Sequence, residues 1–450
     1  MILSTNMSAP HPVQDGQTLR PWSLPARLGF RFAFCYLFLL CLGMAGALKL
    51  FVTYFAYHGQ PKGVLDPLWH RVAPWVAVHL LRLPPLTVLT IGDTLYDYVL
   101  LACQVLLAAG ATLVWSLLDR RRTEYRVLLA WLRPAVSLML ACVLFAYGTD
   151  KVFPMQFGKL SLVRLSDRVG DLDRFNLLWT FMAGSTLYTI FSGAVEILAG
   201  LLLLIPRCEA VGALLSIGVM TNVFVLNLAY DVPVKLFSSH LLLCTLFLAA
   251  CEGRRLAPLV SERALAPRRR IPLSRRAWVN RSVAIAHAAV GFAILVLFSV
   301  LMFRNYQARQ AASVPSPLYG IWAVDEFRVS GSPAGPLLTP KVAAALDVHQ
   351  GEDRWQQLII DSSRESAIRL GNGVLDSIAV TVDPGGKTTT FTDPGDPAWK
   401  CVLRIEHPGE DLLHLDGRIN GVETSVRLHR LPSEKLRLTS ARFHWVRSEH

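Results

Sequence analysis

The chain has little charge and lacks the usual signatures of a soluble enzyme. Only 17% of its 450 residues are charged, against about 25% in soluble proteins. None of its eight cysteines stands in a C-x-x-C pair, which argues against a thiol redox centre or a zinc site. The sequence shows no phosphate-binding glycine loop, nucleophile triad or metal-ligand set. We therefore expect neither a nucleotide-using enzyme nor a bound metal, and whether the chain is an enzyme stays open.

Hydrophobic residues dominate instead, and the positive charge is unevenly distributed. They make up 52% of the chain, and the mean hydropathy is +0.39, as in a membrane protein. The net charge is +12, yet residues 315–450 contain 15 Lys and Arg against 18 Asp and Glu. The positive excess belongs to the apolar part, where it indicates membrane topology rather than binding to nucleic acid.

Seven apolar segments are candidates for membrane-spanning helices. About 20 apolar residues cross a bilayer, and segments near this length recur along the first 304 residues. They are 32–54, 99–118, 134–148, 187–205, 211–228, 237–251 and 279–302. The pattern predicts a mainly α-helical polytopic membrane domain over residues 28–304, in contact with the lipid bilayer.

The charges of the loops predict the direction of these spans. Four arginines lie in loop 117–126, eight lie in loop 251–276, and Arg207 lies between the fourth and fifth spans. Because cytoplasmic loops are enriched in Lys and Arg, we assign these three loops to the cytoplasm. Residues 1–27 are polar and have no cleavage site, so they are predicted to be a cytoplasmic tail. Loop 150–185, turn 229–240 and everything after the seventh span then face outward.

The outward loop 58–97 carries apolar residues at helical spacing between residues 65 and 83. A helix fits this pattern, with a kink at Pro74. Two placements remain open, one on the outer membrane surface and one packed against the bundle.

Polar residues gather at the outward ends of the spans, and one acid lies within a span. A charge at the position of Glu196 costs roughly 2.5–3.5 kcal/mol, so Glu196 should face the interior and be paired or protonated. Its small neighbours allow another helix to approach. Pro233 favours a turn that directs the side chains of Asp231 and Lys235 back toward the outward end of the helix bundle, here called the bundle mouth. The candidate polar site comprises Tyr147, Lys151, Glu196, Asn222, Asn227, Asp231, Lys235, His240 and Asp93.

These residues have a functional and a purely structural interpretation. As a site, Lys151, Asp231 and His240 would contact the polar head of a ligand, and Glu196 would relay a proton. As structural residues, outward Asp and Lys would clamp helix ends, and the two asparagines would join neighbouring helices.

The segments "YGTDKVFPMQF", "LLWTFM", "YTIFSGAVEILAGLLLL" and "VMTNVFVLNLAYDVPVKLFSSHLLL" occur in this order. Over residues of about 90–255, they resemble the DoxX-like family of bacterial membrane proteins. The resemblance implies a four-helix core at about 127–255 and a place in the bacterial inner membrane. Some members of that family are subunits of thiosulfate:quinone oxidoreductases or quinol oxidases, so it also implies a quinone as a candidate cofactor. The chain shows no haem-ligand constellation beside these segments.

A linker at 305–316 precedes a second domain at 317–450. Short runs of alternating polar and apolar residues are separated there by turn signals such as "DPGGK" and "NGV". Eight or nine such runs predict an extracytoplasmic, periplasmic antiparallel β-barrel or sandwich. Gly320, Ile321 and Trp322 resemble the G-x-W start of lipocalin-like barrels, with Arg442 as the candidate stacking partner of the tryptophan.

Two functional hypotheses fit these observations. In the first, the chain is a redox-associated membrane component whose bundle binds a quinone or another lipophilic molecule on the outer-leaflet side. In the second, it is a non-catalytic binding or assembly protein, and the bundle anchors a β domain that binds lipid or a partner protein.

Overall fold

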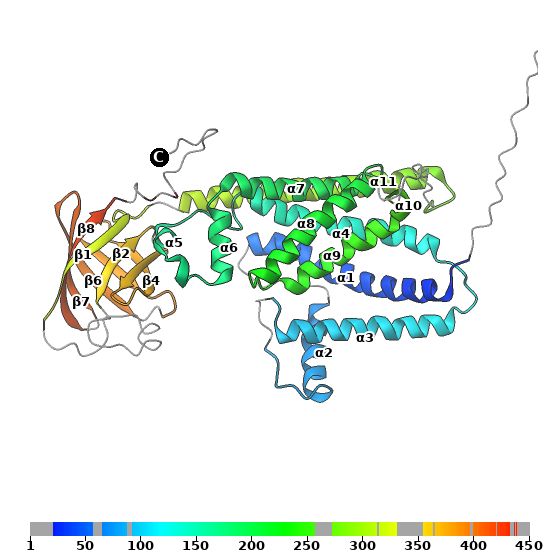
Figure 1. Cartoon of the computed structure of the whole chain (residues 1–450), viewed down its shortest axis with the longest axis horizontal. Coiled ribbons are helices and arrows are strands. Elements are labelled where there is room, and N and C mark those ends of the chain that lie inside the picture. Colours follow the sequence, from blue (N-terminus) through cyan, green and yellow to red (C-terminus); the bar gives the residue numbers. More distant parts are fainter. Residues whose placement is uncertain are drawn as a thin grey trace, which may run out of the picture. The chain divides into compact units, whose positions relative to one another are not determined.

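The computed structural model describes residues 21–56, 65–87, 92–256, 272–312, 315–330, 354–362, 365–396, 399–419, 421–432, 436 and 438 (Figure 1). The chain divides into two compact units, whose boundaries cut across several helices. The first unit contains Met1–Leu140, Leu203–Ala213 and Leu243–Gly291, and the second contains Ala141–Leu202, Leu214–Leu242 and Phe292–His450. Most of the predicted tail 1–27 lies outside the described residues.

The first part of the chain is helical, with long and short elements. The long helices are α1 (Leu24–Ala56), α3 (Leu95–Leu118), α4 (Arg126–Val152), α7 (Thr186–Leu204), α8 (Glu209–Ala229), α9 (Lys235–Cys251) and α11 (Ala277–Ala312). The shorter elements are α2 (Asp66–His79), α5 (Leu162–Ser166), the 3-10 turn η1 (Val169–Asp171), α6 (Arg174–Ala183) and α10 (Gly253–Leu256).

Six helices in the described part of the chain are long and apolar enough to cross a membrane, namely α1, α3, α4, α7, α8 and α11. They confirm the predicted multi-pass helical membrane protein. The predicted span 237–251 falls on α9, an apolar helix of 17 residues. This length is at the lower limit for a crossing, so the seventh span stays a prediction.

Local polar residues set where several helices begin. Before α3, the Thr94 side chain accepts a hydrogen bond from the Asp97 backbone, and Asp97 accepts one from the Thr94 backbone at 2.8 Å. This reciprocal pair satisfies two backbone donors that the first helical turn leaves open. Asp173 caps the start of α6 with a single bond of this kind, since its side chain accepts from the Asn176 backbone N–H at 2.7 Å.

Helix α2 packs one face on α3 and leaves another uncovered. Trp69, Ala73 and Ala77 recur every four residues, and they are buried against side chains of α3. Trp75 is exposed, and Pro74 lies inside α2 without ending it. Of the two predicted placements, packing against a helix of the chain is confirmed, and the uncovered face remains available to a membrane surface.

The C-terminal domain is a closed antiparallel barrel of eight strands. The strands are β1 (Gly320–Val329), β2 (Trp355–Ile360), β3 (Ser366–Leu370), β4 (Leu375–Val382), β5 (Thr388–Thr392), β6 (Lys400–Gly409), β7 (Leu412–Ile419) and β8 (Val422–Leu431). Each strand pairs with the next, and β8 returns to β1 with Ile321 opposite Leu431. Of the two predicted alternatives, the barrel is confirmed and the sandwich is excluded.

Apolar side chains fill the barrel along its alternating inward positions. Leu358 and Ile360 of β2, Phe391 of β5, and Leu413 and Leu415 of β7 belong to one buried cluster. Because side chains alternate between the two faces of a strand, this spacing of two residues identifies the inward face of the sheet.

At the start of the barrel, Trp322 contacts an arginine of β8 and the backbone before β1. The Trp322 indole N–H donates to the Leu318 carbonyl at 2.9 Å, and the Arg430 guanidinium lies 5.9 Å from the indole centroid. Gly320 has a φ of +150°, and a Cβ there would lie 3.0 Å from Arg430 Nε. Arg442, the predicted partner, lies outside the described residues, and Arg430 of β8 stacks on the tryptophan.

Helix α5 packs on the outer wall of the barrel. Leu162 is buried with the outward-facing Ile359. The backbone N–H of Leu162 donates to Asp361 Oδ1 at 3.0 Å. Arg369 donates to the carbonyl of Ser166 at the end of α5. The loop after α4 and the barrel after α11 therefore lie on the same side of a membrane.

Candidate functional site

Glycines bring helices α4 and α7 into close contact. A Cβ on Gly193 would lie 2.5 Å from the carbonyl oxygen of Gly148, and one on Gly200 would lie 2.6 Å from the Phe145 ring. Backbone and ring occupy the space that a side chain would need, so both positions require glycine. The small residues near Glu196 thus do allow a second helix to approach.

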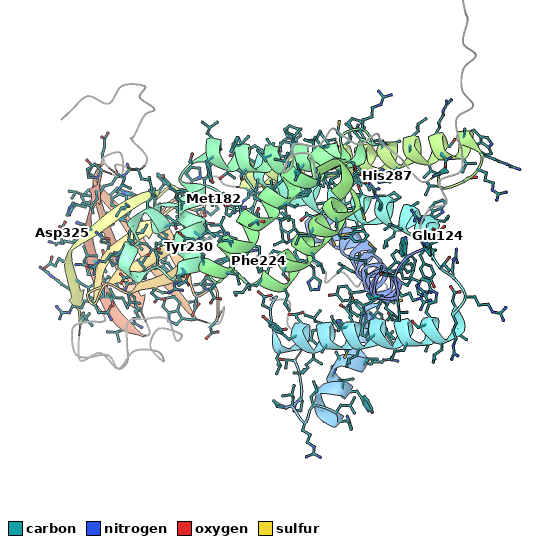
Figure 2. All side chains as sticks on the ribbon, turned by 45° about the vertical axis from the view of Figure 1, so that its right-hand side comes forward. Glu124, Met182, Phe224, Tyr230, His287 and Asp325 are labelled. Carbon is teal, nitrogen blue, oxygen red and sulfur yellow. The ribbon has the colours of Figure 1, made fainter. Side chains whose placement is uncertain are left out.

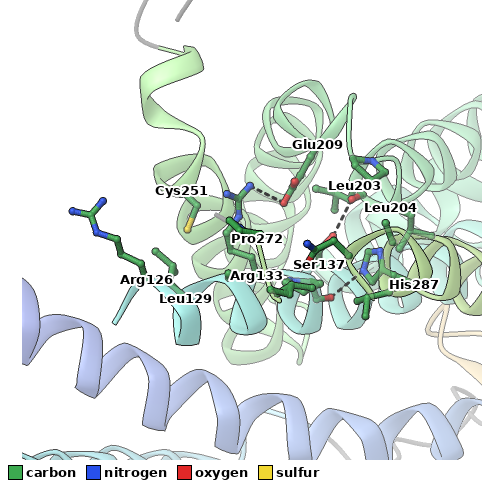
Figure 3. Close-up of a pocket in the computed structure, with 17 residues that line it drawn as sticks. Arg126, Leu129, Arg133, Ser137, Leu203, Leu204, Glu209, Cys251, Pro272 and His287 are labelled. Carbon is green, nitrogen blue, oxygen red and sulfur yellow. Dashed lines mark hydrogen bonds and ion pairs between the residues drawn. The ribbon is translucent and has the colours of Figure 1, made fainter. Parts of the chain in front are cut away.

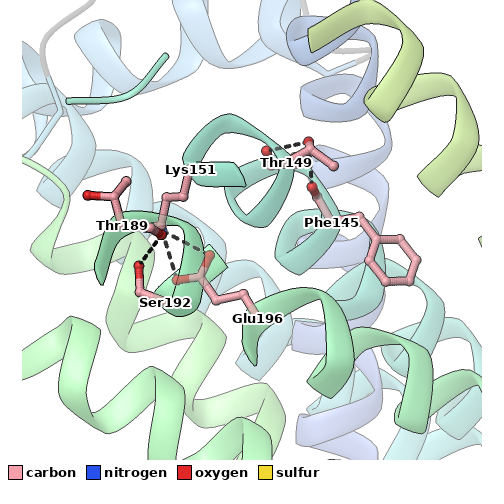
Figure 4. A network of polar contacts seen from close by, with 7 residues as sticks. Phe145, Thr149, Lys151, Thr189, Ser192 and Glu196 are labelled. Carbon is pink, nitrogen blue, oxygen red and sulfur yellow. Dashed lines mark hydrogen bonds and ion pairs between the residues drawn. The ribbon is translucent and has the colours of Figure 1, made fainter. Parts of the chain in front are cut away.

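This crossing places Lys151 of α4 beside Glu196 of α7 (Figure 4). The ammonium nitrogen lies 2.8 Å from Oε1 and 2.9 Å from Oε2 of the carboxylate. Both side chains are buried, with 9% and 4% of their surfaces exposed. Tyr147, one turn before Lys151, places its ring centroid 5.7 Å from the same nitrogen.

The pair explains how two charges are accommodated within apolar helices. Either charge alone would be costly in the bilayer, and a charged partner at hydrogen-bond distance offsets that cost. The expectation that Glu196 is buried and paired is confirmed. Lys151 is bound to Glu196 in this structure, and its expected contact with a ligand stays a prediction.

Asp231 and Lys235 form an ion pair across the turn that precedes α9. Their charged atoms lie 2.6 Å apart, but 78% of the Asp231 side chain is exposed. Asp231 also has a φ of 53°, which a short polar residue tolerates in a turn. The hydrogen bond and the charge of Lys235 lower the pKa of Asp231. The predicted turn is present, but its aspartate faces solvent rather than the bundle.

The remaining predicted residues occupy varied positions. The His240 ring bonds to the Leu236 carbonyl at 2.6 Å. Asn227 is buried, and its Nδ2 has no hydrogen-bond partner among the described residues. Asn222 is exposed on α8. Asp93, with a φ of 58°, belongs to the first unit, whereas the other eight candidates belong to the second.

Apolar side chains of α6 cover the turn between α8 and α9. Leu178 and Met182 are buried with Val232, and Tyr230 packs against them (Figure 2). The ten residues of α6 are too few for a helix that crosses a membrane. Helix α6 gives the predicted mouth an apolar cover.

A half-buried arginine and two buried glutamates toward the other ends of the helices were not predicted. Arg133 of α4 lies 3.0 Å from Glu209 at the start of α8 (Figure 3). It also bonds to Glu252 after α9. The sequence contained one sign of these contacts, because each glutamate stands directly beside an apolar run. Since the three residues lie far apart in the sequence, spacing alone does not connect them.

A comparison with curated proteins finds "Uncharacterized protein YwoB" of Bacillus subtilis (strain 168). It is 36% identical over 118 residues, which make up 26% of this chain and 75% of YwoB. The chain belongs to the same family as YwoB. The YwoB-like part is about a quarter of the chain, and the name of YwoB assigns no activity. No family model matches the chain, and no solved structure matches it.

Proposed function

We propose that the chain is a redox-associated protein of the bacterial inner membrane, of DoxX-like type, that binds a quinone or another lipophilic molecule at the outer-leaflet side of α4 and α7. The supporting observation is the buried Lys151–Glu196 pair. Ionisable residues within membrane helices commonly mark substrate pathways or proton relays. A structural clamp alone could be built from apolar residues at lower cost.

The chemistry of the pair suits the head of a quinone. The Lys151 ammonium can donate a hydrogen bond to a carbonyl oxygen, and the Glu196 carboxylate can accept or return a proton at that oxygen. Tyr147 lies beside both and offers an aromatic face to a flat ring. Lys151 and Glu196 bind each other at rest, so an incoming head group would divide the pair.

The test compares two double variants in the purified full chain. Lys151→Met with Glu196→Gln removes both buried charges, and Asp231→Asn with Lys235→Gln removes the exposed pair. After incubation with ubiquinone and menaquinone analogues, bound quinone is extracted and quantified. The proposal expects loss of binding in the first variant and retention in the second. Equal binding in both would overturn it.

A second candidate function rests on the barrel. Its inward positions carry a packed apolar cluster, and its wall already receives α5. These contacts support a membrane-anchored binding or assembly protein that uses the outer surface of the barrel for lipid or protein. A chain ending at Ala312 separates the two functions, because quinone binding by the bundle should survive that truncation, whereas barrel-dependent binding should be lost.

A further inference from the structure

A pocket of about 430 Å³ lies in the first unit, among helix ends that are predicted to face the cytoplasm. Residues of α4, α11 and the turn before α8 line it (Figure 3). Its walls are mostly apolar and include Leu129, Leu203 and Val283. Its volume falls within the range of about 300–1,000 Å³ that is usual for small-molecule sites. It shares no residue with the Lys151–Glu196 pair.

Both arginines that line this pocket are paired with carboxylates. Arg133 faces two carboxylates, those of Glu209 and Glu252. Arg126, the other lining arginine, pairs with Glu124 at 2.6 Å. Each of these two guanidinium groups is thus already bound by at least one carboxylate. An anionic head group would have to compete with those carboxylates for either arginine.

One buried donor at the pocket, which has no partner among the described residues, favours a ligand that accepts a hydrogen bond. The Arg133 Nε is buried and has no hydrogen-bond partner within the described residues. A buried donor of this kind is costly until an acceptor reaches it, and an ammonium group cannot accept. The lining is therefore unsuited to a cationic head as well as to an anionic one.

Hydrogen bonds between helices join residues that line the pocket. Pro134 has no N–H, so the Ala130 carbonyl cannot accept the usual helical bond. The carbonyl of Pro134 itself accepts from His287 Nε2 of α11 at 3.0 Å. Ser137, one turn later, donates to the Leu203 carbonyl at 3.0 Å. These bonds tie α4 to two other helices around the space.

We propose that this pocket binds a lipophilic molecule whose head is uncharged and accepts hydrogen bonds. An ester carbonyl of a neutral glycerolipid and a quinone carbonyl share this chemistry. Arg133 Nε donates to the head, and the walls formed by Leu129 and Val283 hold the apolar part. The pocket is a second site, separate from the proposed quinone site between α4 and α7.

The experiment uses three photoreactive probes on the full chain in detergent: a monoacylglycerol, a ubiquinone analogue and a fatty acid. Ala284→Trp fills the pocket, because Ala284 lines it. Ile285→Trp is the matched control, because Ile285 is 69% exposed on the same helix. Should Ala284→Trp fail to fold, Leu129→Phe fills the pocket from α4. Mass spectrometry of labelled peptides locates each probe.

At least one neutral probe should label peptides from α4 or α11, and the filling variant should reduce this label roughly tenfold or more, with little change in Ile285→Trp. The neutral probe that labels more strongly identifies the source of the head group. Stronger labelling by the fatty acid, equal labelling of both tryptophan variants, or no labelling by either neutral probe would overturn the proposal. Lys151→Met with Glu196→Gln should leave this label intact, which separates the pocket from the proposed quinone site.

Discussion

Lys151 and Glu196 are nearly fully buried, and each oxygen of the carboxylate lies within 2.9 Å of the ammonium nitrogen. At the residue scale, each charge can be buried only because the other neutralises it. Removal of one partner leaves a charge in an apolar interior, whereas removal of both leaves none. The two cases should therefore differ strongly in stability.

Glu196→Gln alone should lower the stability of the purified protein by about 3–5 kcal/mol, because it strands the Lys151 charge. Lys151→Met should have a similar effect through Glu196. The double variant should recover most of the loss. Thermal melting in one detergent measures all three. Single variants that melt together with the unmodified protein would show that the pair is not buried in the folded chain.

The sequence predicts part of this site for a physical reason. A carboxylate within an apolar run must find a partner, so the burial and pairing of Glu196 follow from insertion cost alone. The partner depends on which helix approaches and at which level, and the contact between Gly148 and Gly193 decides this. The contacts of Arg133 could not be predicted for the same reason. Glu209 begins α8 and Glu252 follows α9, so only the packing of these helices brings both glutamates to Arg133.

At the scale of elements, the crossing of α4 and α7 depends on two facing glycines. Gly193→Ala should destabilise the protein by about 1–3 kcal/mol, because the new Cβ meets the Gly148 backbone, which cannot rotate away. Gly218→Ala is the matched control, since a Cβ there would meet nothing within 4 Å. It should be neutral or stabilising by about 0.5–1 kcal/mol. Melting curves that rank the two variants in the opposite order would contradict the close crossing.

The contact between α5 and the barrel gives a second prediction at this scale. Ile359→Glu places a charge under α5, so the helix should detach and trypsin should cut faster at Arg164 and Arg168. Val402→Glu provides the control, since Val402 is 47% exposed on β6. Limited proteolysis followed by mass spectrometry measures both rates. Equal cleavage in the two variants would mean that α5 does not protect this segment.

Long apolar runs and strand alternation predict most of the elements, because each reports a periodicity within one segment. The short helices α5 and α6 were not predicted. Their five and ten residues are too few to show a helical period, and the packing of Leu162 on the barrel and of Met182 beside Val232 stabilises them. Tertiary contacts, rather than local sequence, determine such elements.

At the scale of the whole molecule, the direction of the chain through the membrane is the main prediction. Alkaline phosphatase fused after Asn305 should be active and a fusion after Arg122 inactive, since the enzyme folds in an oxidising exterior. A fusion after Arg168 should also be active, because α5 and the barrel share one side. Activity measured in cells, normalised to fusion abundance, tests all three. The reverse pattern would place the barrel in the cytoplasm.

The order of strands in the barrel has a consequence for biosynthesis. Seven pairings join neighbours in the sequence, and the eighth joins β1 to β8, the last strand that the structure describes. A ribosome releases β1 before β8, so the ring stays open until β8 has been made. In the predicted orientation, the strands are threaded across the membrane during this interval. Until β8 arrives, β1 offers an unpaired edge to any neighbouring chain.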